Sequence, residues 1–402
     1  MELSCAQETG IDYGRLFRHV EALRNVLLVP IDRSGSDFFQ SLLDGHPQIL
    51  QITGIWHFHH WWKLARCREN LSDLIDEFVW HSCPSCSHIA KFKSYYNKIE
   101  RWEQLGDDRK GFFEVDIGSF KKHMMCAMTG RELNSKNFFL AVNLAYGLAT
   151  KLDVQKTKML FYHIHHMERL KDFHEDFADF DLICTMREPR NTLVSAMERW
   201  RAFDPGTYNP AMLHYRIKRI FEGVEPASGY TKNIKVVKLE DLHMSPEKVL
   251  GEFCRTYGME FRDSLLESSY HGKKWWGDAL SGRYLDGFNK KALEKTWGGR
   301  LFSYDSFLIE FILEDKWRHY GYPVGHRRWY HFLSAIFTVL LPMRYELDIA
   351  VYNFKRPRSV KKMTAIIRDC LKFYILRVIL YYKFIWRKTR RKIYLTDYFY
   401  PA

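Results

Sequence analysis

The chain has 402 residues, of which 46% are hydrophobic and 16% are aromatic. This composition excludes an intrinsically disordered chain and is sufficient for a large hydrophobic core. The formal net charge of +13 is unevenly distributed: residues 331–402 contain 15 Lys and Arg against 4 Asp and Glu, and the first 330 residues contain 46 against 44. The near-neutral body argues against a nucleic-acid channel, and the basic tail indicates contact with an anionic surface.

The N-terminal residues and the cysteines bear on the cellular compartment. Residues 1–8 contain neither the cationic nor the apolar region of a secretory signal, and the eight cysteines are scattered along the chain. We therefore expect free thiols and a cytoplasmic protein. The segment His81–His88 contains two Cys and two His, but no second Cys-x-x-Cys occurs, so we expect a turn there rather than a zinc site.

Strands and helices alternate along the predicted fold. The apolar, β-branched segment 24–31 predicts a buried strand, the turn Asp32–Ser36 follows it, and an apolar-periodic stretch from Phe38 predicts a helix. Further strands are predicted at 159–164, 180–186 and 234–239, and further helices over 191–200 and from Ser245-Pro246 onward. The sequence therefore predicts an α/β fold, with a parallel sheet flanked by helices and ligands bound beyond the carboxyl ends of the strands.

The first strand-to-helix turn, Arg33-Ser34-Gly35-Ser36, has the composition of a phosphate-binding loop. Backbone N–H groups at a helix N-terminus bind anions, glycine allows close approach, and arginine adds a forked cation. The turn lacks the Gly-x-x-x-x-Gly-Lys-[Ser/Thr] spacing of nucleoside triphosphatases, which disfavours ATP or GTP hydrolysis. Taken alone, the turn is better explained as a serine-capped helix start with a surface arginine.

A second turn resembles part of a known donor site. The run 182–195 contains an apolar strand, Arg187-Glu188-Pro189-Arg190 and then Ser195, and is similar to the segment with which PAPS-dependent sulfotransferases hold the 3′-phosphate of 3′-phosphoadenosine 5′-phosphosulfate (PAPS). Residues 33–47 are similar to the 5′-phosphosulfate loop and helix of that family. Further similar stretches are the strand and acidic dipeptide at 238–242, the helix end at 257–258 and the glycine- and lysine-containing loop at 271–278.

The resemblance covers residues 24–50 and 158–325 and implies a P-loop-like sulfotransferase fold of the carbohydrate type, with PAPS as co-substrate and no metal. By this resemblance Arg33 acts on the leaving phosphate oxygen. The donor-binding residues that it implies are Arg33, Ser34, Gly35, Ser36, Asp37, Arg187, Ser195 and Lys273, with Arg190 as a further helper. Two positions depart from the family pattern: Asp32 replaces a proline or basic residue, and Asp37 replaces a Thr or Ser.

Transfer to a sugar hydroxyl needs a general base, and several groups qualify. His163, His165 and His166 end the predicted strand at 159–164, at the carboxyl edge of the sheet. Glu114 and Asp116 form a second group, and His57, His59 and His60 in an aromatic run form a third. Each histidine can equally be a hydrogen-bonded structural residue.

The basic tail contains an amphipathic pattern over 361–392, in which Arg377 alone is off the polar face. No stretch reaches the ~18 charge-free apolar residues of a spanning helix. Two interpretations stay open: a helix lying in the interface of an anionic membrane on its cytoplasmic face, or a helix packed on the catalytic domain with a solvated basic side.

We therefore expect a catalytic domain over 1–330, in which 51–157 shapes the acceptor site, and a helical extension over 331–402. The activity that the resemblance implies is sulfuryl transfer from PAPS to a hydroxyl of a carbohydrate or glycolipid by in-line displacement. Two alternatives are a nucleotide-binding phosphotransferase and a membrane-associated PAPS- or nucleotide-binding protein with an inactive site.

Overall fold

The computed structural model describes residues 10–65, 69–80, 105–111, 115–203, 205–277, 287–294, 297–325, 328–356, 359–390 and 396–399. Its centre is a six-stranded sheet in the order β2-β3-β1-β4-β5-β8, and every neighbouring pair is parallel. The strands are β1 (Arg24–Pro30), β2 (Ile49–Gln51), β3 (Met159–His163), β4 (Asp181–Met186), β5 (Ile234–Lys238) and β8 (Asp397–Tyr398). The predicted strands at 24–31, 159–164, 180–186 and 234–239 are thus confirmed.

The strand order creates a topological switch point. After β1 the chain crosses to β2, returns to β3 beside β1, and then continues on the other side of β1 with β4 and β5. The connections after β1 and β3 therefore leave the sheet near each other, and in such sheets the crevice at the carboxyl ends of the strands is the usual ligand site.

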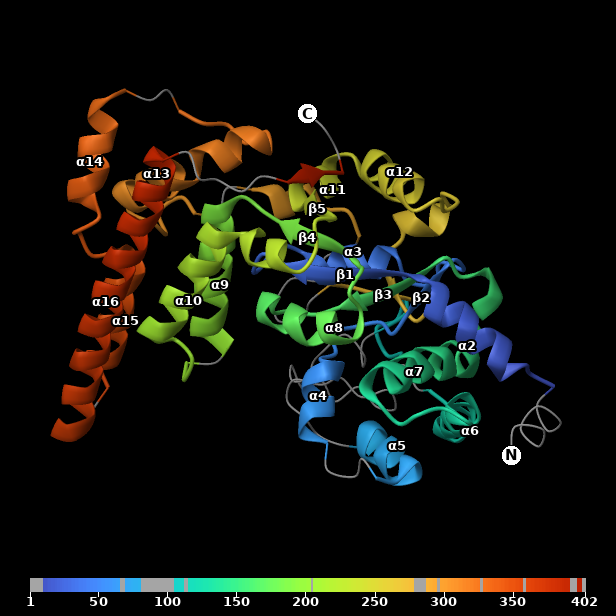
Figure 1. Ribbon diagram of the computed structural model, residues 1–402. Coiled ribbons are helices and arrows are strands. Elements are labelled where there is room, and N and C mark those ends of the chain that lie inside the picture. Colours follow the sequence, from blue (N-terminus) through green and yellow to red (C-terminus); the bar gives the residue numbers. More distant parts are fainter. Residues whose placement is uncertain are drawn as a thin grey trace.

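Helices cover both faces of the sheet, as predicted (Figure 1). Side chains alternate along β1, so that Leu27 and Val29 belong to one core while Val26 and Leu28 belong to the other. On the second face lie α3 (Ser36–Leu42), α11 (Leu239–Met244) and α12 (Pro246–Thr256). The helix predicted from Ser245-Pro246 is confirmed as α12, although the Ser245 side chain makes no capping hydrogen bond.

The larger core lies on the opposite face. It includes side chains of α2 (Tyr13–Ala22), α4 (Phe58–Leu64), α5 (Leu71–Trp80), α6 (Ile117–Met128), α7 (Ser135–Ala149), α8 (Leu170–Asp176), α9 (Pro189–Phe203), α10 (Pro210–Glu222) and α13 (Ser303–His319). Within 51–157, the aromatic run around α4 packs into this core: Trp56 stacks on Phe139, and Trp56 and Trp61 are both about 2% exposed. These two tryptophans therefore stabilise the fold and offer no open platform for a sugar ring.

Three helices, α14 (Tyr330–Thr338), α15 (Arg344–Phe354) and α16 (Val360–Thr389), lie beside α10 and α13 at one side of the molecule (Figure 1). The helix predicted over 361–392 is confirmed as α16. After it the chain returns to the sheet, where β8 pairs with β5. None of the described helices is both long and apolar enough to cross a bilayer.

Candidate functional site

The turn after β1 is built around one glycine. Gly35 precedes α3 with φ +81°, a left-handed conformation that glycine adopts without strain. A Cβ at this position would lie 2.4 Å from Leu239 Cδ1, so the loop also needs the space that glycine leaves. The Ser34 hydroxyl donates to the Thr185 carbonyl oxygen at 2.8 Å, and the Ser34 N–H donates to the Asp32 carbonyl oxygen. Ser34 therefore fixes the loop against the end of β4, and the N–H groups of the first turn of α3 face outward from the helix start.

Asp32, the first departure from the family pattern, has an internal role. It is buried, has φ +58°, and its carboxylate forms an ion pair with Arg216 of α10 at 2.5 Å. Aspartate is one of the few residues that tolerate the left-handed region. Next to it, Arg219 donates to the carbonyl oxygens of Pro30 and His165 at 2.7 and 3.0 Å. The two arginines of α10 thus hold the ends of β1 and β3 together.

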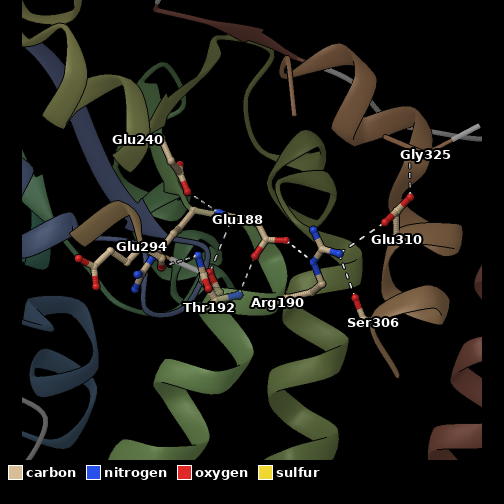
Figure 2. Close-up of polar contacts among 10 residues, drawn as sticks. Glu188, Arg190, Thr192, Glu240, Glu294, Ser306, Glu310 and Gly325 are labelled. Atoms are coloured by element: carbon tan, nitrogen blue, oxygen red, sulfur yellow. Dashed lines mark hydrogen bonds and ion pairs between the residues drawn. The ribbon is translucent and has the colours of Figure 1, made fainter. Parts of the chain in front are cut away.

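The turn after β4 is anchored by Glu188 (Figure 2). Its carboxylate accepts the Asn191 N–H at 2.8 Å, at the start of α9, and the Arg190 Nε–H at 2.6 Å. Arg190 also donates to Ser306 Oγ at 2.9 Å and lies over the ring of Trp297 at 4.2 Å. These contacts direct Arg190 toward α13 and explain it as a residue that joins α9 to α13.

Arg187 occupies the other side of this turn, next to the first turn. Burial lowers the pKa of the Arg187 guanidinium, the nearby Arg33 lowers it further, and Glu240 opposes the shift. Glu240 is itself held by the Glu188 N–H at 2.8 Å and by the Tyr322 hydroxyl at 2.9 Å. The structure therefore brings the arginines of the two predicted turns together at the carboxyl ends of β1 and β4. Two cations in one partly buried place favour a polyanionic ligand.

Histidines collect at the carboxyl end of β3, beside the same loop. His163 is fully buried, and its Nδ1 lies 2.8 Å from Gln40 Oε1 and 3.9 Å from an oxygen of Asp37. The ring of half-buried His165 lies 5.1 Å from that of His163. Asp37, the second departure from the family pattern, thus belongs to a cluster with the two predicted histidines.

The other candidate bases are placed less well for proton transfer. Burial lowers the pKa of His57 to about 3 and that of His166 to about 4, so that both are very weak bases. His59 forms an ion pair with Asp176, and His60 contacts Arg169, both on the side of α8. Two further acids were candidates: the carboxylate of Asp116 caps α6, and Glu114 lies outside the described residues, as does the segment 81–88.

The remaining predicted donor residues lie on α9, on α3 and on a short hairpin. Ser195 is half-buried on α9, two turns after Arg187, and Ser36 and Asp37 open α3. Lys273 lies on the short hairpin of β6 (Ser269–Tyr270) and β7 (Lys273–Lys274), which is tied to α3 by the Asp44 carboxylate through Ser269 and Gly272. Sequence reasoning missed Gln40 and Arg216, and it noted Glu240 only as part of the acidic dipeptide at 238–242, without a role. A polar side chain inside an apolar helix was the only available signal, and it marks only Gln40.

A metal ion is a second occupant that the cluster at β3 could hold. One ligand atom from each of Asp37, His163 and His165 lies within 4.8 Å of the others. Carboxylate and imidazole are ligands of zinc and other transition metals. The same three groups also suit a proton-transfer relay, in which a carboxylate and a buried imidazole orient a second imidazole.

Comparisons with known proteins give structural matches only. No protein-family model matches the chain, and no curated protein sequence matches it significantly. The sulfotransferase domain from the curacin biosynthetic pathway is 13% identical, covers 75% of this chain and 99% of its own, and has a TM-score of 0.40. Sulfotransferase STF9 from Mycobacterium avium is 9% identical and covers 81% of this chain and 83% of its own, with a TM-score of 0.39. The sulfotransferase domain of the Synechococcus PCC 7002 olefin synthase is 15% identical over 80% of this chain and 96% of its own, with a TM-score of 0.34.

Proposed function

We propose that this protein is a sulfotransferase that moves a sulfuryl group from PAPS to a hydroxyl of a carbohydrate or glycolipid. The observation that carries the proposal is the convergence of two arginine turns, Arg33 and Arg187, at adjacent strand ends beside the start of α3. PAPS has a phosphosulfate at its 5′ position and a phosphate at its 3′ position, so each of the two neighbouring arginine turns can bind one of these groups. A nucleoside triphosphate would need one continuous loop with a lysine, and the loop at 32–36 has none.

The assignment of roles follows from this placement. The N–H groups at the start of α3 and Arg33 hold the 5′-phosphosulfate, and Arg187 with Ser195 holds the 3′-phosphate. Ser34 contributes by fixing the loop, because its hydroxyl and N–H already have partners in the protein. Lys273 lies on the hairpin beside α3, from which it can reach the donor from the far side.

In the transfer step the acceptor oxygen attacks sulfur as the bond between sulfur and the bridging phosphate oxygen breaks. The hydroxyl proton moves to a base, and negative charge develops on the leaving phosphate oxygen, where Arg33 stabilises it. We assign the base to His165, because it is half-buried at the carboxyl edge of the sheet while His163 is fully enclosed. His163, held by Gln40, then positions the His165 ring.

A histidine base is compatible with the proposed acceptor class. A sugar or glycolipid hydroxyl is a weak acid and ionises little at neutral pH, so its transfer depends on a neighbouring imidazole. In the segment 51–157, the start of α4 lies next to the end of β3, where the ring centroids of His57 and His166 are 5.5 Å apart. We assign the shaping of the acceptor site to this segment.

Calorimetry with 3′-phosphoadenosine 5′-phosphate, the desulfated donor, tests the donor assignment. We expect micromolar binding to the wild type and at least tenfold weaker binding to Arg187→Ala, which corresponds to about 1.4 kcal/mol or more. The matched control is Arg201→Ala, because Arg201 is an exposed arginine on the same helix, α9. Its affinity should equal that of the wild type.

Two results would contradict the proposal. Absence of binding to the wild type, or tighter binding of ATP than of the bisphosphate, would favour a phosphotransferase. Binding without transfer of labelled sulfate from PAPS to any member of a panel of oligosaccharides and glycolipids would favour an inactive nucleotide-binding protein.

A further inference from the structure

Exposed apolar side chains are concentrated in the C-terminal extension. Among the described residues, sixteen of the twenty large hydrophobic side chains that are exposed lie between residues 329 and 386. Trp329 is 79% exposed, Phe337 is 69% exposed and Val360 is 80% exposed. The remaining four are scattered over the body of the molecule: Leu64, Met125, Met244 and Phe261. Monomeric soluble proteins rarely gather so many in one region unless it contacts a partner or a membrane.

The exposed side chains of α16 form a stripe along the helix. The stripe consists of four exposed side chains spaced four residues apart: Ile367, Leu371, Ile375 and Ile379. Each is rotated by only about 40° around the helix axis from the one before it. The buried side of the helix is a different one: Arg377, Leu380, Tyr381, Phe384 and Ile385 face the protein. This side packs against α10, where Phe221 contacts the rings of Tyr381 and Phe384.

The packing of α14 extends this stripe into a surface. The Tyr374 hydroxyl donates to the Leu340 carbonyl oxygen at 2.6 Å, and the Tyr382 hydroxyl donates to the Ile336 carbonyl oxygen at 2.8 Å. These bonds place α14 alongside the middle of α16, next to the stripe (Figure 1). The exposed side chains of this end of α14 are Phe337, Leu340 and Leu341.

Basic side chains border the apolar stripe. Lys361, Lys372 and Lys383 are exposed and are spaced eleven residues apart, so they lie on one side of α16. In projection down the helix axis, Lys372 lies about 20° from Ile379. Further exposed cations of this region are Arg328, Lys355, Arg356, Lys362, Arg368 and Arg390. The described acids between residues 328 and 390 are each ion-paired: Glu346 with Arg377, Asp348 with Arg344, and Asp369 with Arg368. The exposed cations of α16 therefore gather along the Ile379 edge of the apolar stripe, where Lys361 and Arg368 lie within about 20° of Ile379 in projection.

We propose that α14 and α16 form a membrane-docking surface that lies in the interface plane of an anionic bilayer. Apolar side chains of the stripe enter the acyl boundary, and the bordering lysines and arginines contact anionic headgroups. An interface between two copies of this chain would instead place both basic margins against each other, which repels. The charge pattern therefore favours the bilayer over a second copy. The inference does not depend on the reaction that the site performs.

Flotation of the full-length protein with vesicles tests the surface. The two vesicle types are phosphatidylcholine alone and phosphatidylcholine with about a third phosphatidylserine. We expect binding to the anionic vesicles that is at least tenfold stronger than to the neutral ones and that weakens as NaCl rises from about 0.05 M to about 0.5 M, because salt screens exposed charges. Brominated lipids should quench the fluorescence of the exposed Trp386 and Trp329.

Double variants distinguish membrane docking by this surface from non-specific binding of exposed apolar side chains to vesicles. Ile375→Glu/Ile379→Glu should reduce vesicle binding at least tenfold, and Lys361→Glu/Lys372→Glu should remove the preference for anionic lipid. The matched control is Leu64→Glu/Met125→Glu, which changes two exposed apolar side chains elsewhere and should bind like the wild type. Circular dichroism and binding of 3′-phosphoadenosine 5′-phosphate establish that each variant is folded.

Equal binding to both vesicle types, or wild-type binding by Ile375→Glu/Ile379→Glu, would overturn the proposal. So would a wild-type dimer in analytical ultracentrifugation that ignores vesicles and dissociates in this variant, because the surface would then be an interface between copies. Loss of nucleotide binding with intact vesicle binding would count against the proposed function alone.

Discussion

Buried Arg377 and half-buried Arg187 show how neighbouring charges shift the pKa of the same residue type in opposite directions in two regions of this molecule. Arg377, in the extension, donates to both carboxylate oxygens of Glu346 at 3.0 and 2.8 Å and to the Leu341 carbonyl oxygen at the end of α14. Burial alone would lower the pKa of Arg377, but the hydrogen bonds that it donates to Glu346 and the negative charge of Glu346 outweigh burial and raise it. This arginine is neutralised within the protein.

The pKa of Arg187, at the sheet edge, shifts in the opposite direction. Burial lowers it, Glu240 opposes this shift, and Arg33, a second cation, adds to it. The nearby Glu240 carboxylate is shared with the Glu188 N–H and the Tyr322 hydroxyl. Arg377 is bonded to a carboxylate of its own region, whereas Arg187 lies where the two turns at the sheet edge meet, in the place that we propose binds the donor. Charge changes should therefore affect function at the sheet edge and stability in the extension.

The largest expected effect is at the sheet edge. His165→Asn should lower kcat by about 10²- to 10⁴-fold, because the acceptor hydroxyl loses its base. Affinity for 3′-phosphoadenosine 5′-phosphate and the midpoint of urea unfolding should stay at wild-type values, since the side chain is half-buried and the change is nearly isosteric. Sulfate transfer from labelled PAPS measures the first quantity. Activity within threefold of the wild type would exclude His165 as the base.

The next effect concerns stability. Arg377→Ala should lower the free energy of unfolding by about 3 kcal/mol, because it leaves Glu346 and two helix-end carbonyls without their donor. Urea unfolding measures this loss, and nucleotide affinity should not change. The control is Arg368→Ala, an exposed arginine of the same helix, which should cost at most about 0.5 kcal/mol. A tenfold loss of nucleotide affinity in Arg377→Ala would contradict the assignment of ligand binding to the sheet edge and of stability to the extension.

The smallest effect lies where the body joins the extension. The Asp305 carboxylate of α13 accepts the N–H groups of Phe302 and Arg344, the first residue of α15, and burial raises its pKa to about 6. The folded state therefore holds the Asp305 proton more tightly than the unfolded state. The stability that this proton contributes is complete below the unfolded pKa of about 4 and is lost as pH rises through about 6.

Asp305→Asn removes this titration and keeps an oxygen that can accept the two N–H groups. Its free energy of unfolding relative to the wild type should rise by about 2–3 kcal/mol between pH 4 and pH 7. Urea unfolding at a series of pH values measures the difference. A difference that stays constant with pH would show that Asp305 has an ordinary pKa.

Much of the fold and part of the site could be predicted from the sequence. The four main strands were found because buried parallel strands are apolar along their whole length, and their alternation with helices determined the parallel sheet. Both arginine turns were found, because a strand end followed by a helix start is a local signal. Which histidine of the several candidates serves the site was not determined, because imidazoles at a strand end and in an aromatic run look alike in sequence.

Tertiary structure decided which charges have partners. Asp32 pairs with Arg216, 184 positions away, and Arg190 is directed to α13 by Ser306 and Glu310. Periodicity placed Arg377 off the polar face of α16, yet only packing supplied Glu346 and showed that this position is buried. The sequence by itself determined the local elements, because backbone preference and apolar periodicity act over a few residues. The assignment of each cation to the protein or to a ligand depends on charges distant in sequence, which only the folded chain brings together.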